Sequence, residues 1–525
     1  MTSRHYDVVV LGRSLGALAA AALLARRDFR VLLLGQGQRP CDYHFEGHLL
    51  RRRTFTLLAA TSPAWRRVLH ELAQTPRFRR RLKNLDPMFS FMMPGRRVQV
   101  PPDIELFARE VDREFPEVRQ LVDELYATFA QVNAAADGAF ERDLAWPPGK
   151  VWERIETGKI AAGLPFVRES SQQDLMGKFP VGHPYRLIVR HPALFAANLA
   201  VSPEDLPPFP LARLHGAWTR GVQAVAGGED EVADFLLSRI EAHGGECRLD
   251  GRAAALVVRR NSVAGILQDG DEEATSASAV VTDLSGEQVA DLAGGAGITA
   301  RARRDWPQLS AVAGRYIVSL VVRREALPEP LAHEAFLMPP VSHRPDPRRP
   351  PIHLQRVDPP VRTEDGDDTS RRRETLLVAE ALLPVRGTLT LLEAREAVLA
   401  TVREYLPFLD EHLIVVDSPH DGLPLRDTSR RPAREVERIH LRTSAPGPEP
   451  MQWLWKVEPA GWHDLAGEPF RGPIPGTYLV GSTVLPALGQ EGELLAAWSA
   501  ARSITRKNRT RQKIRRQMWT KIETG

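Results

Sequence analysis

The chain has 525 residues, enough for two or more domains or for one large fold with a second one inserted. Its apolar content of 43% is that of a globular protein, and no apolar run reaches the ~20 residues of a membrane-spanning helix. The two cysteines, Cys41 and Cys247, show no metal-ligand spacing; they argue against a disulfide scaffold and fit a reducing, cytoplasmic compartment. A strand predicted from Tyr6 onward leaves no room for a signal peptide.

The positive charge is concentrated at the end of the chain. The formal net charge is +4, yet residues 502–525 hold nine Lys or Arg side chains and a single acid. Residues 1–501 therefore carry 61 basic and 65 acidic side chains, a net charge of −4. Such a body repels phosphates and contains no recognisable nucleic-acid-binding module, so we expect no nucleic acid as a partner.

The basic tail has a pattern of its own. If it is helical, Ile514, Met518 and Ile522 share one narrow face edged by cations. This pattern is typical of peripheral contact with an anionic membrane, here through Arg502–Lys521. A disordered, solubilising tail is the alternative interpretation.

The first elements along the chain are a strand, a glycine turn, a helix and a second strand. The apolar runs Val8–Leu11 and Val31–Leu34 predict strands, and the Ala- and Leu-rich segment Leu18–Arg27 predicts a helix. Strand, turn, helix and strand within about thirty residues form a βαβ unit. Such a unit directs the unpaired N–H groups of its helix at a pyrophosphate.

The nucleotide motif in this unit is degenerate. Gly12 is present, but Ser14 and Ala17 stand where the dinucleotide pattern has glycine. Gly35, followed by Gln36, stands where an acid would bind the ribose hydroxyls. The sequence therefore leaves two interpretations, a dinucleotide site or a structural unit that has lost its ligand.

The same turn also matches Gly-x-Ser-x-Gly, the pattern of a hydrolase nucleophile elbow, with Ser14 as nucleophile. The elbow of α/β-hydrolases follows several strands, whereas one strand precedes it here. No Asp and His partners stand out in the expected order. A hydrolase is therefore the less favoured interpretation.

The rest of the chain alternates helical and strand patterns. Amphipathic spacing predicts helices over Leu57–Leu82 (one or two), Asp103–Phe115, Val118–Ala135, Leu194–Val201, Glu229–His243, Leu391–Tyr405 and Gly489–Ile504. Apolar runs and turn residues predict a hairpin over Pro87–Pro102, a second over Ala253–Arg259 and Ser262–Gln268, and strands at Glu246–Leu249, Ala279–Thr282, Tyr316–Val322, Ile352–Val357, Thr375–Leu383, Met451–Val457 and Thr477–Val480.

Four blocks occur in an order that resembles a known family. They are the N-terminal βαβ unit, the hairpin PMFSFMMPGRRVQVPP, the segment from GGEDEVADFLLSRIEAHGGE to AVVTD, and the closing GTYLVGSTVLPALGQEGELLAAWSAAR. Together they resemble the carotenoid (phytoene) desaturase and isomerase group of FAD-dependent, amine-oxidase-like oxidoreductases. The resemblance implies an α/β fold with a Rossmann-type FAD-binding domain and an inserted α+β substrate domain. It assigns 1–70, 215–300 and 470–505 to the FAD domain, 71–214 and 301–469 to the substrate domain, and leaves 506–525 as the basic tail.

The resemblance also implies a function and a set of cofactor contacts. The function is FAD-dependent desaturation or isomerisation of a long apolar, carotenoid- or lipid-like substrate. Flavin chemistry needs little from side chains, so no catalytic residue is predicted. The implied FAD contacts are the glycine turn, the second strand's end, the backbone of the strand that meets the adenine, and the closing turn: Gly12, Ser14, Leu15, Gly16, Gln36, Ala255, Gly481, Ser482, Gly489 and Glu491.

The departures from the family pattern fall on these contacts. Gly35 replaces the ribose-binding acid, Ser482 replaces the acid after the last strand's glycine, and Pro40-Cys41-Asp42 occupies the place of a Gly-Gly-Arg stretch. Three lost contacts would cost roughly 2–5 kcal/mol of binding free energy. The rival hypothesis is therefore a non-catalytic relative that keeps the fold as a binding or scaffold protein with weakened or lost FAD binding.

Several side chains allow two interpretations each. Glu491 lies near the flavin or caps the last helix, whose N-terminus favours an acid. Trp453, Trp455 and Trp462 suit packing better than a substrate wall. The Met and Phe residues of the first hairpin suit its core better than a lipid tunnel (Met88, Phe89, Phe91, Met92 and Met93). His44 and His48 have i,i+4 spacing without a third ligand, so no metal site is predicted.

Overall fold

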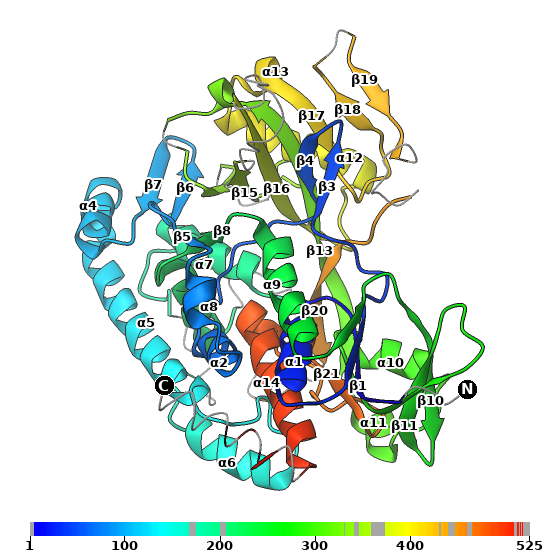
Figure 1. Cartoon of the computed structure of the whole chain (residues 1–525). Helices are drawn as coiled ribbons and strands as arrows, with labels where there is room; N and C mark the ends of the chain where they lie inside the picture. The colour runs from blue at the N-terminus through cyan, green and yellow to red at the C-terminus, as the bar shows by residue number, and fades with distance from the viewer. Residues whose placement is uncertain are drawn as a thin grey trace.

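Two β-sheets organise the structure of the protein, which is a computed structural model (Figure 1). The structure describes residues 5–166, 175–199, 206–329, 331–340, 346–358, 373–429, 432–438, 447–458, 462, 465–508, 512, 513, 515 and 517. Within these residues one sheet has seven strands and the other has ten. In the same part of the chain, no helix is long and apolar enough to cross a membrane.

The seven-stranded sheet is built from segments far apart in sequence. Its parallel part runs β21-β12-β1-β2-β9, and the antiparallel hairpin β10–β11 extends it from β12. The bounds are β1 His5–Leu11, β2 Val31–Leu34, β9 Glu246–Arg248, β10 Ala253–Arg259, β11 Ser262–Gln268, β12 Thr275–Thr282 and β21 Thr477–Leu479. Strands β1 and β2 are buried along almost their whole length, as their apolar runs predict.

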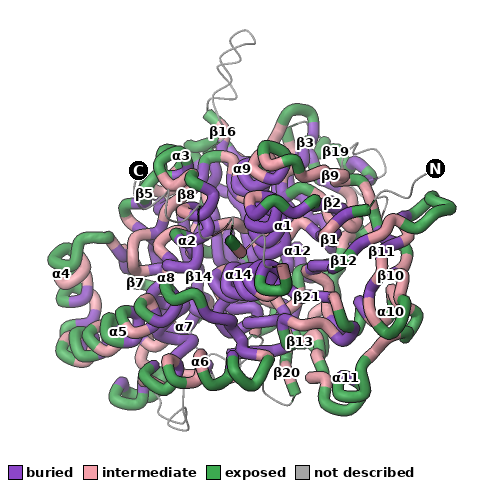
Figure 2. Tube along the Cα trace, turned by 60° about the horizontal axis from the view of Figure 1, so that its bottom comes forward, coloured by how far each residue is buried: buried purple, intermediate pink, exposed green. Residues whose placement is uncertain are grey.

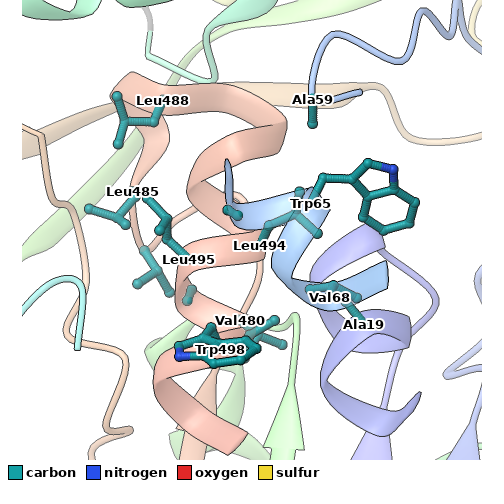
Figure 3. Close-up of a cluster of buried hydrophobic side chains, with 14 of the residues drawn as sticks. Ala19, Ala59, Trp65, Val68, Val480, Leu485, Leu488, Leu494, Leu495 and Trp498 are labelled. Atoms are coloured by element: carbon teal, nitrogen blue, oxygen red, sulfur yellow. The ribbon is translucent and has the colours of Figure 1, made fainter. Parts of the chain in front are cut away.

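Helix α1 (Leu15–Arg26) packs in the middle of the molecule between α9 (Gly228–Ala242) and α14 (Gly489–Arg506). Its residues 16–25 are all buried, and six of them are alanines. Small side chains let α14 approach closely. Figure 3 shows Ala19 of α1 beside Trp65 and Val68 of α2 (Pro63–Glu71) and Leu494 of α14. Burial is densest around α1 and α14 (Figure 2).

The ten-stranded sheet is mostly antiparallel. Its order is β19-β18-β17-β13-β16-β15-β14-β6-β7, with β20 paired to β13. The bounds are β6 Phe89–Met93, β7 Arg96–Val100, β13 Gln308–Arg323, β14 Glu334–Leu337, β15 Ile352–Val357, β16 Glu374–Pro384, β17 Leu413–Asp417, β18 Leu425–Asp427, β19 Arg434–Val436 and β20 Gln452–Glu458. The long strand β13 is therefore the centre of this sheet, pairing with β16, β17 and β20.

The remaining elements cover or connect the two sheets. The small hairpin β3 Asp42–Phe45 and β4 His48–Arg51 packs on β13, and β5 Leu82–Asn84 pairs with β8 Gln223–Val225. The helices are α3 Thr75–Arg79, α4 Ile104–Glu114, α5 Arg119–Phe140, α6 Val151–Ala161, α7 Tyr185–Ala196, α8 Pro208–Thr219, α10 Gly286–Leu292, α11 Ala300–Asp305, α12 Leu391–Tyr405 and α13 Leu409–His412. In Figure 1, α4, α5 and α6 follow one side of the molecule.

Most predicted elements are confirmed, and one helix was misplaced. Leu194–Val201 was predicted as a helix, but α7 ends at Ala196, and Ala197–Leu199 is not helical. Pro192 lies inside α7, and its presence concealed the helical pattern of the preceding residues. Residues 200 and 201 lie outside the described part.

The exposed fractions of the Met and Phe residues of the first hairpin, and the contacts of the tryptophans, bear on the prediction that these side chains serve packing. Met88, Phe89 and Phe91 are 0–2% exposed and belong to the large core cluster. Met92 and Met93 are buried as well. Trp462 packs edge to face on Trp146, with ring centroids 5.3 Å apart. Trp453 and Trp455 are half-buried on β20. The Met and Phe side chains of the hairpin and Trp462 therefore serve packing, while the role of Trp453 and Trp455 stays a prediction.

Candidate functional site

Two neighbouring groups lie close to the backbone of the glycine turn between β1 and α1, the side chain of Asp283 and the carbonyl group of Val480. Gly12 has φ +111°, and a Cβ there would lie 2.0 Å from Oδ1 of Asp283. A Cβ on Gly16 would lie 2.0 Å from the carbonyl oxygen of Val480, at the end of β21. Glycine is therefore required at both positions by the chain's own neighbours.

Ser14 is the N-cap of α1. Its Oγ accepts a hydrogen bond of 3.2 Å from the backbone N–H of Ala17. This is the usual role of serine at this position, because it satisfies one of the helix's free N–H groups. The hydroxyl is thus engaged in capping, an arrangement that gives the hydrolase interpretation no support.

The N-terminus of α1 already holds an acidic side chain, the carboxyl group of Asp283. Asp283 directly follows β12, and its Oδ2 accepts a 2.9 Å hydrogen bond from the backbone N–H of Ser14. Gln38 donates to Oδ1 at 2.9 Å and accepts from the backbone N–H of Arg13 at 2.7 Å. Burial raises the pKa of Asp283. A helix N-terminus favours negative charge, and here the chain itself supplies it.

A second carboxylate reaches the same turn from α14. Oε2 of Glu493 accepts a hydrogen bond of 3.2 Å from the backbone N–H of Gly16. Burial raises the pKa of Glu493 to about 8, because the group is desolvated and lies near Asp283. The site therefore favours the neutral form of Glu493 at pH 7.

The end of β2 is in contact with the segment from Leu249 to Ala253. A Cβ on Gly35 would lie 1.9 Å from the carbonyl oxygen of Leu249, so this position has no room for any side chain. Gln36 instead reaches β10: its Nε2 donates to the carbonyl of Ala253 at 3.1 Å, and its Oε1 accepts from the N–H of Ala253 at 2.9 Å. The sequence pointed to Ala255, which is half-buried in β10 opposite Leu267.

The closing turn follows β21. A Cβ on Gly481 would lie 2.3 Å from the carbonyl oxygen of Asp283, which places this glycine beside the α1 turn. Gly489 has φ +53°, and a Cβ there would lie 2.1 Å from the carbonyl oxygen of Ala196. Ser482 is half-buried between these two glycines. The structure thus brings Gly12, Gly16, Gly481 and Asp283 together, while Gly489 lies against α7.

Glu491 is directed at α8. Its two carboxylate oxygens accept hydrogen bonds of 2.6 Å each from Nε and Nη2 of Arg213, and Ser62 donates to Oε1. Burial alone would raise the pKa of Glu491, but the Arg213 guanidinium outweighs it and lowers the pKa. A cavity of about 20 Å³ next to this pair has room for one water molecule. Glu491 therefore serves an ion pair between helices.

A buried charged cluster on the ten-stranded sheet was missed by the sequence. Nε2 of His353 lies 2.8 Å from Glu334, and Nδ1 lies 3.4 Å from Glu380, which also pairs with Arg315. The ring of Phe336 stacks on His353 with centroids 5.0 Å apart. Burial alone would lower the pKa of His353, but the two carboxylates raise it to about 9. The charges of the two acids are balanced by His353 and Arg315.

His44 and His48 lie on the two strands of the hairpin β3–β4. His48 Nδ1 lies 3.1 Å from Oε2 of Glu374, while His44 pairs in register with Leu49. Among the described residues, no group of three His, Cys, Asp or Glu side chains is arranged to hold a metal ion. Cys41 is buried and Cys247 half-buried, both as free thiols.

Part of the basic tail lies on the body. Arg502 is buried and pairs with Asp143 at 3.3 Å and Glu156 at 3.4 Å. Arg515 lies 3.2 Å from Asp143 and 3.5 Å from Glu71. The residues of the predicted apolar stripe, Ile514, Met518 and Ile522, lie outside the described part. Some of the tail's cations are thus neutralised within the chain.

Comparison with known proteins identifies the fold. No family model matches the chain, and no curated protein matches it. Among solved structures, an oxidoreductase from Methanosarcina mazei is 14% identical, with 94% of this chain and 99% of that chain covered and a TM-score of 0.55. A triple mutant of putrescine oxidase with redesigned cofactor binding is also 14% identical, with 96% and 99% covered and a TM-score of 0.58. The PF1083 protein from Pyrococcus furiosus is 16% identical, with 93% and 95% covered and a TM-score of 0.52.

These likenesses establish the fold alone. The chain has the mixed α/β fold of FAD-binding oxidoreductases such as putrescine oxidase, which confirms the predicted fold class. The two sheets are each assembled from the separated segments described above. The domain boundaries and the individual cofactor contacts stay predictions.

Proposed function

We propose that the chain is a FAD-dependent oxidoreductase of the phytoene desaturase-like group, acting on a long apolar substrate. The observation that carries the proposal is the anion site at the N-terminus of α1. There the backbone N–H groups of Ser14 and Gly16 both donate to oxygens of acidic side chains, Asp283 and Glu493. A pyrophosphate makes the same demand on a βαβ turn. The fold shared with an oxidoreductase and with putrescine oxidase supports this assignment.

The backbone of the site fits a dinucleotide, but some side chains must move to admit it. The turn from Gly12 to Gly16 would hold the pyrophosphate, and the N–H and C=O of Ala253 would hold the edge of the adenine. Both places are taken in this structure by Asp283 and Gln36. Gly481 lies beside the same turn, and it and the following Ser482 would face the middle of the cofactor.

When bound, FAD supplies the electron-transfer chemistry, so the chain's residues have other tasks. They bind the cofactor, orient the substrate and exclude water. The tight packing of α14 on α1 suits the last task, because Leu494, Leu495 and Trp498 are 0–2% exposed (Figure 3). No proton donor or acceptor is assigned, since Glu491 and His353 are each bound by opposite charges.

Access to an apolar substrate is the reason for proposing membrane contact. Helix α6 exposes 75% of Val151 and 57% of Ile155, next to the exposed cations Lys150, Arg154 and Lys159. Arg506, at the start of the basic tail, lies 4.4 Å from the ring of Trp152. We call these residues of α6 and Lys150 the α6 patch. Apolar side chains surrounded by cations suit the surface of an anionic membrane.

The test is the absorbance of the purified protein, followed by titration with FAD. We expect flavin bands, or their appearance when FAD is added, together with quenching of flavin fluorescence. A colourless protein that leaves flavin fluorescence unchanged at all FAD concentrations contradicts the proposal. Labelling of Ser14 by a serine-reactive phosphonate would instead support a hydrolase.

The hydrogen bonds that Asp283 makes with Ser14 and Gln38, and Gln36 with Ala253, favour a second candidate function. In it, the chain is a non-catalytic relative that keeps the fold as a binding or scaffold protein. Its polar groups at the turn and at β10 are satisfied without a ligand. The same titration tests this candidate, because it predicts that FAD binding is weakened or lost.

A further inference from the structure

Three side chains of this chain imitate the contacts of a dinucleotide. Asp283 lies on the helix N-terminus as a phosphate would, and Gln36 meets both backbone groups of Ala253 as the edge of an adenine would. Gln38 joins the two halves of the turn by binding both Asp283 and the N–H of Arg13. Every one of these contacts is between residues more than 20 positions apart in sequence, so each depends on the folded site.

The carboxylate and a pyrophosphate exclude each other for two reasons. The first is space, because the Asp283 oxygens already lie 2.0–2.2 Å from where a Cβ of Gly12 would be. The second is charge, since burial here already disfavours ionised groups and raises the pKa of Asp283 and Glu493, and a pyrophosphate would bring further negative charge into the same place.

We propose that Asp283, Gln36 and Gln38 form an internal latch that closes the dinucleotide site, so that FAD binds only after these side chains have been displaced. This inference rests on the proposed function and adds a regulation to it. Closing preserves the hydrogen bonds of α1 and β10 in the empty protein. Opening exposes the same groups to the ligand. The latch therefore lowers FAD affinity without altering the scaffold.

The experiment compares FAD binding in four proteins by flavin fluorescence quenching. They are the full chain, Asp283→Ala, Asp283→Asn and the control Asp291→Ala, which removes an exposed acid from nearby α10. We expect Asp283→Ala to bind FAD at least about tenfold more tightly than the full chain, because the competing hydrogen bonds are charge-assisted. Asp283→Asn, which keeps the shape and removes the charge, should lie between them, and Asp291→Ala should equal the full chain.

A second variant, Gln36→Ala, and a second ligand, ADP, test the adenine end of the site. Gln36→Ala frees the N–H and C=O of Ala253 and should also tighten FAD binding. ADP, which lacks the flavin, should raise the melting temperature of Asp283→Ala more than that of the full chain. This second measurement also shows that Asp283→Ala is folded.

The outcomes separate the latch from the proposed function. Tighter binding by Asp283→Ala and Gln36→Ala supports both. Equal FAD affinity in the full chain and both variants overturns the latch while the proposed function stands. Failure of every folded variant to bind FAD and ADP overturns the proposed function, and with it the latch, since there is then no site to close.

Discussion

Arg213 of α8 and Glu491 of α14 form a two-pronged ion pair in the interior, with both hydrogen bonds 2.6 Å long. The side chains are 2% and 9% exposed. Arg213 also pairs with Asp137 of α5 at 2.7 Å, and Arg220 binds the same acid at 3.0 Å. The pair thus fixes the start of α14 relative to α5 and α8, next to the closing turn.

Removing one partner of this pair should destabilise the protein strongly. Arg213→Ala leaves Glu491 buried without its cation, so we expect a loss of about 3–5 kcal/mol in the free energy of unfolding. Urea unfolding measures this loss. A loss below about 1 kcal/mol would show that Glu491 is solvated rather than buried.

A double variant serves as the control. Arg213→Met combined with Glu491→Leu replaces both charges by apolar side chains of similar size, and it should recover most of the stability. If flavin binding survives in the double variant, Glu491 has no part in binding the cofactor. This would separate the two interpretations that the sequence left open for Glu491.

The sequence predicted the local part of the site and missed its long-range part. The turn at Gly12–Gly16 and the strands beside it follow from apolar runs and glycines within thirty residues. Asp283 is also visible after the strand ending at Thr282, but nothing local indicates that it reaches Ser14. Likewise, Gln36 follows a recognised strand, while its partner Ala253 lies on another. Such contacts depend on the order of the strands in the sheet, which brings together residues more than 200 positions apart in sequence.

The raised pKa of Glu493 predicts a pH-dependent stability. A buried acid with a folded pKa of about 8 and an ordinary unfolded pKa costs stability as the pH rises from about 4.5 to 8, because only the unfolded state ionises easily. Glu493→Gln removes this term. We expect the variant and the full chain to be similar at pH 5, and the variant to be more stable at pH 8 by up to about 5 kcal/mol.

Melting temperatures of both proteins between pH 5 and 9 provide the measurement. The difference between the two curves cancels groups that titrate in both proteins. A constant difference across this range would mean that Glu493 is ionised in the folded protein at all these pH values. The hydrogen bond from Gly16 would then be that of a carboxylate.

His353 predicts a loss of stability at higher pH by a different route. Its folded pKa of about 9 lies above its unfolded value, so its contribution is full below about pH 6.5 and is lost as the pH rises through 9. His353→Gln keeps a donor but removes the charge between Glu334 and Glu380. We expect it to cost about 2–4 kcal/mol at pH 6 and less at pH 9. A cost that is equal at both pH values would contradict a charged His353.

This cluster shows a second limit of sequence reasoning. Glu380 lies in a predicted strand and Glu334 in β14, which was not predicted, and a buried acid has no local signature of its partner. His353 and Glu380 face each other because β15 and β16 pair in register. The register was not predictable from either strand alone. The strands themselves, Ile352–Val357 and Thr375–Leu383, were predicted correctly or to within one residue.

Gly12 and Gly481 should respond differently to the removal of Asp283. Gly12→Ala places a methyl group against the Asp283 side chain and in a positive φ, and we expect a loss of about 2 kcal/mol or more. Gly481→Ala meets the backbone carbonyl of Asp283 instead. Adding Asp283→Ala should therefore relieve part of the Gly12→Ala cost and none of the Gly481→Ala cost. Equal relief in both double variants, measured by urea unfolding, would refute the described position of the carboxylate.

The basic tail supplies the last prediction, and the structure decides where to truncate it. A chain ending at Ala501 would remove Arg502, which is 2% exposed and pairs with Asp143 and Glu156, so it would damage the body as well. A chain ending at Asn508 keeps the whole of α14 and removes six of the nine tail cations, among them Arg515 with its ion pairs to Asp143 and Glu71. At about 1 kcal/mol per cation near an anionic surface, this truncation should lower liposome binding at least about tenfold at low salt. Sedimentation with anionic liposomes measures it, and binding of the full chain should weaken as salt shortens the screening length to about 10 Å at 0.1 M.

The double variant Val151→Ser and Ile155→Ser should weaken binding through the α6 patch, whereas Ile104→Ser, at a site 83% exposed on distant α4, should not. Equal sedimentation of the full chain, the truncated chain and the α6 variant would exclude membrane contact through these residues.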